Sequence, residues 1–147
     1  MNEDALRDRL GNALLDTVSD AIIYADAAGS IRFWNKGAEN LLGHLAAEVI
    51  GQSLDVIIPQ PQRARHWEGF QRVMETGVSR YGAGDVMAVP ALRKDGSRIS
   101  VEFTIVPLRD ASGRMEGMLS IMRDVTKRFE ETRALRREIA SLRQPPG

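Results

Sequence analysis

The chain of 147 residues contains no cysteine. Without thiols it cannot form a disulfide, a zinc–thiolate site or an iron–sulfur cluster, and it has no cysteine nucleophile. Photochemistry that needs a thiol is excluded for the same reason. Histidine is almost as scarce, with only His44 and His66. Because hydrolytic triads rely on an imidazole base, and because no pair of carboxylates stands out by its pattern, we expect no enzyme.

The chain also lacks net charge and long apolar runs. Twenty basic side chains balance twenty acidic ones, so no overall positive field attracts a nucleic acid or an anionic membrane. No apolar run approaches the roughly 18 residues of a membrane-spanning helix. The opening MNEDALRDRL is too charged for a signal peptide. We therefore expect a cytoplasmic protein that binds neither nucleic acid nor membrane.

What is present is a composition that supports one folded domain, since 43% of the residues are hydrophobic. Apolar residues at three- and four-residue spacings predict an amphipathic helix over residues 3–18. Two β-branched and aromatic runs around a glycine turn predict a β-hairpin over 21–35. The stretch 36–50, rich in alanine, glutamate and leucine, predicts two short helices, and a longer helix is expected over 62–76.

The segment that follows is β in character. Three runs separated by the turn signals KDGS at 94–97 and DASG at 110–113 predict a three-stranded meander. In the middle run, apolar and polar residues alternate over 98–105, which predicts one buried and one wetter face of the sheet. Pro90 lies in the first run, and because proline cannot donate a ladder hydrogen bond, we expect a local irregularity there.

The last part of the chain is highly charged and predicts a solvent-exposed helix over 125–143. Apolar residues at heptad positions, among them Leu135, Ile139 and Leu142, form a short seam typical of a weak coiled coil. The alternative is a helix that folds back on its own domain.

Several strings occur in an order and spacing that resemble those of PAS sensor domains: IRFWNKGAENLLG, AAEVIGQSLDVIIP, ALRKDGSRISVEFTIVPLRDASG and RDVT. The resemblance covers about residues 14–126. It implies an α+β PAS fold, a five-stranded antiparallel sheet with helices on one face, flanked by N- and C-terminal amphipathic helices. Residues 1–18 are then the N-terminal helix, 19–124 the PAS core, and 125–147 a C-terminal signalling helix.

His66 is the most informative residue for ligand binding. On the expected helix it shares one face with Trp67, Phe70 and Val73, so it points inward. The segment IIPQPQRARH resembles the stretch that carries the proximal histidine in oxygen-sensing haem PAS domains. This resemblance implies haem b as a candidate cofactor with His66 as the iron ligand. The alternative is a histidine that hydrogen bonds satisfy within the protein.

A second iron ligand is a separate question. The distal arginine of the haem group has no evident match, and Met87 stands at the corresponding position, either as a sixth iron ligand or as core filler. A flavin or another chromophore attached through a cysteine is excluded. The candidate cofactor-binding residues are His66, Met87, Trp67, Phe70, Val73, Ile105 and Leu119.

The resemblance implies a sensory module that binds a small ligand or cofactor and relays the change through 123–126 to its C-terminal helix. The alternative is a cofactor-free PAS module for dimerisation or protein interaction. For both we expect a homodimer formed through the terminal helices and the sheet face, and a downstream kinase, cyclase or regulator as the output domain. The exit helix itself holds no histidine for phosphotransfer, and its arginines alternate with glutamates, which disfavours DNA binding.

Overall fold

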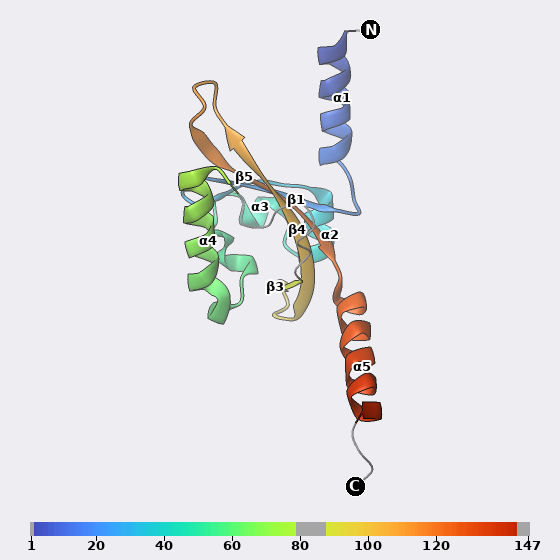
Figure 1. Ribbon diagram of the computed structural model, residues 1–147. Coiled ribbons are helices and arrows are strands. Elements are labelled where there is room, and N and C mark those ends of the chain that lie inside the picture. The colour runs from blue at the N-terminus through green and yellow to red at the C-terminus, as the bar shows by residue number, and fades with distance from the viewer. Residues whose placement is uncertain (1, 79–87, 144–147) are drawn as a thin grey trace.

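The computed structural model describes residues 2–78 and 88–143, which build a five-stranded antiparallel sheet (Figure 1). The strand order is β2-β1-β5-β4-β3, so the first and last strands of the chain are neighbours. The strands are β1 Ala21–Asp26, β2 Ile31–Trp34, β3 Val89–Leu92, β4 Arg98–Arg109 and β5 Met115–Asp124. The expected hairpin and the expected meander therefore join into one sheet through β1 and β5.

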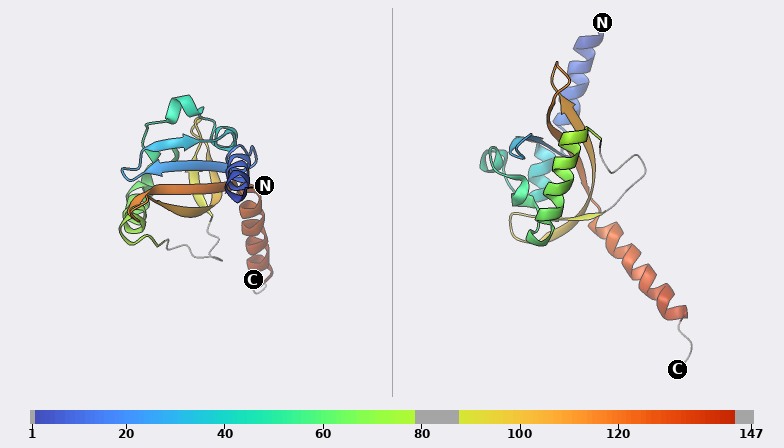
Figure 2. Two further views of the ribbon diagram at one scale, coloured as in Figure 1. Left: turned by 90° about the horizontal axis from the view of Figure 1, so that it is seen from above. Right: turned by 60° about the vertical axis from the view of Figure 1, so that its left-hand side comes forward.

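Helices cover one face of the sheet, and two more helices project from it (Figures 1 and 2). The covering elements are α2 Lys36–Leu42, α3 Ala46–Val49, the 3-10 turns η1 Leu54–Ile57 and η2 Gln60–Gln62, and α4 Arg63–Thr76. The projecting helices are α1 Glu3–Leu15 and α5 Thr126–Arg143. This α+β architecture confirms the sequence prediction. Within the described residues, no helix combines the length and the apolar character needed to cross a bilayer.

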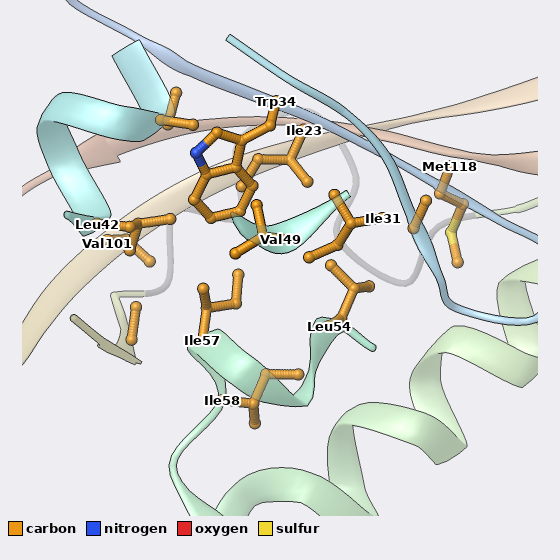
Figure 3. Close-up of a cluster of buried hydrophobic side chains, with 14 of the residues drawn as sticks. Ile23, Ile31, Trp34, Leu42, Val49, Leu54, Ile57, Ile58, Val101 and Met118 are labelled. Carbon is orange, nitrogen blue, oxygen red and sulfur yellow. The ribbon is translucent and has the colours of Figure 1, made fainter. Parts of the chain in front are cut away.

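A single hydrophobic core lies between the inner face of the sheet and the covering helices (Figure 3). Strands, α2, α3 and η1 all contribute to it, and each fully buried aliphatic side chain stabilises the fold by about 1.5–3 kcal/mol. Its largest fully buried aliphatic side chains are Ile23, Ile31, Leu42, Val49 and Val101. The core therefore holds the helices against the sheet and sets the position of α4 beside them.

The turns form where the sequence predicts them, with Gly96 and Gly113 at φ angles of 87° and 86°. The prediction of a local irregularity at Pro90 is wrong. β3 pairs with β4 without a register shift, and Pro90 lies opposite Ser100. The reason is topological: β3 is an edge strand, and an edge strand tolerates a residue that has no N–H donor.

Asn35 joins four segments through one buried amide. Its Oδ1 accepts hydrogen bonds from the N–H groups of Ile22 and Ala38, both at 2.8 Å. Its Nδ2 donates to the carbonyl oxygens of Thr17 at 3.1 Å and Asp20 at 3.0 Å. The first contact fixes β1 and the second caps α2. The other two hold the linker between α1 and β1.

We expect Asn35→Ala to lower the free energy of unfolding by about 3 kcal/mol, because it leaves several buried polar groups without partners. Asn40→Ala is the matched control. Asn40 is exposed and makes one long contact, from Nδ2 to the Val18 carbonyl oxygen at 3.4 Å, so we expect a change within about 0.5 kcal/mol. Urea unfolding monitored by circular dichroism measures both, and equal losses for the two variants would contradict this role of Asn35.

Candidate functional site

His66 lies beside the apolar face of α4. Phe70 and Val73 of this helix are buried in the core, and Trp67 packs against the same cluster. The centroid of the His66 ring lies 4.8 Å from that of Trp67 and 6.1 Å from that of Phe70. The Trp67 and Phe70 rings are themselves 5.2 Å apart in an edge-on arrangement. α4 therefore presents a contiguous cluster of three rings.

The imidazole of His66 has an apolar environment. The residue is half-buried, and its Nδ1 is buried without a hydrogen-bond partner among the described residues. Burial lowers the pKa of His66 because the cation loses hydration, and the nearby Asp55 carboxylate offsets only part of this effect. The ring is therefore mainly neutral at pH 7. A neutral imidazole is the form whose nitrogen lone pair can bind a metal.

Trp67 ties α4 to two other segments. Its Nε1 donates a hydrogen bond to Oδ1 of Asp55 in η1 at 2.8 Å. Its six-membered ring lies against Gly29 in the β1–β2 turn, where an added β-carbon would collide with the ring. A depression of about 320 Å³ opens to solvent beside this contact. It is lined by Ala27, Ala28, Trp67, Phe70, Gln71 and Met74.

The other candidate residues occupy different places. Val73 is buried in the core, and Ile105 of β4 packs against that core. Leu119 lies on the opposite face of the sheet, because its neighbour Met118 faces the core and successive strand residues alternate. The structure therefore does not bring Leu119 together with His66. Met87 falls outside the described residues.

Sequence reasoning missed two residues of this region. Asp55, which orients Trp67 and acts on His66 electrostatically, has no sequence signal, because only the folded chain brings η1 beside α4. Gly29 was recognised as a turn residue, and its φ of 82° agrees, but its contact with the Trp67 ring was not foreseen. Within the described ranges, no cluster of three or more His, Asp or Glu side chains is arranged to hold a metal ion.

The junction between β5 and α5 is held by Ser100 of β4. The Val125 N–H donates to the Ser100 carbonyl oxygen at 2.8 Å, and Oγ1 of Thr126 accepts from the Ser100 N–H at 2.9 Å. Oδ1 of Asp124 accepts from the Thr126 N–H at 2.9 Å, which gives the first N–H group of the exit helix a partner. The start of α5 is therefore fastened to the sheet through backbone groups.

Ion pairs surround the same junction. Arg128 of α5 reaches Glu102 of β4 at 2.7 Å, and Arg123 at the end of β5 reaches Asp20 in the α1–β1 linker at 3.2 Å. These side chains are partly exposed, so each pair contributes about 1 kcal/mol or less to stability. The two ion pairs connect the first turn of α5 and the N-terminal linker to adjoining strands.

Comparison with known proteins identifies the family. The family model described as PAS fold matches residues 15–130, and the chain belongs to this family. The PAS domain of a protein from Colwellia psychrerythraea superimposes with a TM-score of 0.71 at 30% identity, covering 84% of this chain and 99% of that one. The resemblance inferred from the sequence is thus confirmed.

Curated relatives include sensor proteins. The sensor protein FixL of Bradyrhizobium diazoefficiens is 31% identical over 142 residues, which are 95% of this chain and 27% of that protein. The oxygen sensor protein DosP of Escherichia coli is 32% identical over 108 residues, 71% of this chain and 13% of that protein. The chain thus spans about a quarter or less of the length of these relatives, and it is similar to one PAS-containing region of each.

The lowered pKa of His66 predicts a pH dependence of stability. The unfolded chain binds the proton near pH 6.5, whereas the folded chain binds it only at lower pH. The stabilising contribution is therefore complete above about pH 6.5 and is lost as the pH falls towards the pKa of the folded state. In urea titrations between pH 7.5 and 5, we expect the wild type to lose more stability than His66→Gln. Parallel curves for the two proteins would contradict the lowered pKa.

Proposed function

We propose that this PAS domain is a sensory module that holds a small ligand or cofactor beside α4, with haem b as the first candidate. The observation that carries the proposal is the His66 imidazole, whose buried Nδ1 has no hydrogen-bond partner within residues 2–78 and 88–143 and whose pKa is lowered by burial. Two further points support it. The segment that precedes His66 resembles that of oxygen-sensing haem PAS domains, and one relative is named an oxygen sensor protein.

The donor chemistry of the site fits haem. Haem iron takes a neutral imidazole as its proximal ligand, and His66 is mainly neutral at pH 7. The Trp67 and Phe70 rings make the surroundings of His66 apolar, which suits an apolar macrocycle. Bound haem supplies an iron that takes a diatomic gas or changes its oxidation state. In this proposal His66 would hold the iron, and Met87 is the candidate for a second iron ligand.

The relay runs along β5. α4 lies against β5, and β5 continues directly into α5 through residues 123–126. A ligand that shifts α4 therefore acts on the strand whose end starts the exit helix. Ser100 and Asp124 hold that end, so a change in β5 alters the direction or the stability of the first turn of α5. The output domain that reads this change is proposed to be a kinase, a cyclase or a regulator.

The test is the absorbance spectrum of the full chain after incubation with haem and removal of the excess. We expect a strong Soret band for the wild type and for His44→Ala, and its loss for His66→Ala. His44→Ala is the matched control because it removes the other histidine, while the His44 contact to Trp34 Nε1 is made by its backbone carbonyl and is retained. A wild type that stays colourless would reject haem, and an unchanged spectrum in His66→Ala would reject His66 as the ligand.

A second candidate function is a cofactor-free module for homodimerisation. The observation that favours it is exposed apolar surface on both projecting helices. Leu10 and Leu14 of α1 are 55% and 68% exposed, and Leu135 and Ile139 of α5 are 58% and 48% exposed. Val106 and Leu108 on the outer face of the sheet are exposed as well. Covering these residues in a symmetric pair would remove apolar surface from water.

Sedimentation equilibrium tests this candidate. We expect the wild type to sediment as a dimer, and we expect a Leu6→Asp, Leu10→Asp variant to dissociate at least tenfold more readily, because two charges enter the contact. Asn12→Asp, which adds a charge on the opposite side of α1, is the control and should keep the wild-type mass. A dimer of unchanged strength in the double variant would exclude this interface.

A further inference from the structure

Two buried polar atoms at the start of α4 have no hydrogen-bond partner among the described residues. They are Oε1 of Gln62 and Nδ1 of His66. Gln62 is the N-cap residue of α4, yet its side chain does not cap the helix. Its backbone already has near-helical angles, with φ of −98° and ψ of −5°. The four-residue spacing therefore makes the two side chains neighbours on one side of the helix.

The two atoms are chemically complementary. The amide oxygen of Gln62 can only accept a hydrogen bond, whereas a neutral imidazole carries one N–H donor, on either Nδ1 or Nε2. Buried polar groups in folded proteins are nearly always paired. A single hydrogen bond from Nδ1–H of His66 to Oε1 of Gln62 satisfies both atoms. The structure does not contain this bond, so its formation requires a rotation of the two side chains within their turn of the helix.

Two other polar residues of this region, Arg63 and Asp55, already make hydrogen bonds. Arg63 donates from Nε to the Ile58 carbonyl oxygen at 3.0 Å and from a terminal nitrogen to the Asp55 carbonyl oxygen at 3.3 Å. Oδ1 of Asp55 accepts from Nε1 of Trp67. Gln62 differs from them in having a buried acceptor atom with no partner among the described residues.

We propose that Gln62 is a positioning residue for His66: its Oε1 accepts the Nδ1–H and holds the ring in the tautomer whose Nε2 lone pair is open to a ligand. Metal-binding histidines almost always donate their other ring N–H to such an acceptor, which fixes both the tautomer and the ring orientation. The role of Nε2 as an iron ligand rests on the proposed function, but the tautomer is a property of the chain alone.

The tautomer can be measured without any cofactor. In the ¹⁵N-labelled full chain at pH 7.5, long-range proton–nitrogen correlations distinguish Nδ1–H from Nε2–H. We expect His66 to be mainly in the Nδ1–H form in the wild type and to shift towards Nε2–H in Gln62→Met, which has similar length but no oxygen. Gln62→Glu, which keeps an acceptor, should restore the Nδ1–H form. Gln71→Met is the control on the same helix, because Gln71 is exposed and contacts Glu75.

A second measurement uses haem-loaded protein. Loss of an acceptor behind a metal-binding histidine typically weakens metal binding by 10- to 100-fold. We expect Gln62→Met to lose haem to a competing apoprotein faster by a factor in this range, with Gln62→Glu and Gln71→Met close to the wild type. Equal rates of loss for wild type and Gln62→Met would overturn the positioning role.

The outcomes separate this inference from the proposed function. An Nε2–H tautomer in the wild type overturns the role of Gln62 even if the Gln62 variants fail to fold. A tautomer that does not respond to Gln62→Met overturns it as well, whether or not haem binds. A protein that takes up no haem but shows the Gln62-dependent tautomer supports the positioning role, and in that case only the haem proposal fails.

Discussion

Each residue of the sheet faces either the covering helices or the opposite side, and this period of two governs where every other part of the molecule can lie. On the inner face, Ile23 and Val101 are fully buried with Leu42 of α2. On the outer face, Val106 and Leu108 remain exposed. The chain therefore covers the inner face of the sheet with its own helices and leaves apolar residues of the outer face exposed. The proposed ligand site and the proposed assembly surface are in this way separated by one layer of β-structure.

Features that depend on neighbouring residues were predictable from the sequence. The capping of α2 by Asn35 and the glycine turns follow from local backbone chemistry, and the face of α4 that carries His66 follows from the helical period. Leu119 was placed wrongly beside the candidate ligand because β5 has apolar residues on both faces. The period of two then gives no preferred assignment. The register with β1 and β4 decides it, and register is a property of the folded sheet.

The candidate site also combines features that the sequence predicts with features that only the folded chain creates. The ring cluster of His66, Trp67 and Phe70 follows from their spacing on one helix. The contact of Trp67 with Asp55 joins residues twelve positions apart, and no pattern in the sequence connects them. Such contacts arise only when η1 and α4 pack together around the core. The burial of His66 also arises only on folding. The sequence indicates that His66 points inward, but its lowered pKa depends on how much water the folded neighbours exclude.

An ion pair joins the strand end at 123–126 to the N-terminal linker, and α4 packs against the same strand. Asp20 stands in the linker after α1 and pairs with Arg123, while the backbone of the same linker is held by Asn35. In the proposed relay, a displacement of α1 would reach the end of β5 through a side chain, and a displacement of α4 would reach it through the strand itself. Because exposed ion pairs are weak, the first route is easily broken, whereas the strand route runs through ladder hydrogen bonds. We therefore expect events at the proposed ligand site to couple to α5 more firmly than events at α1 do.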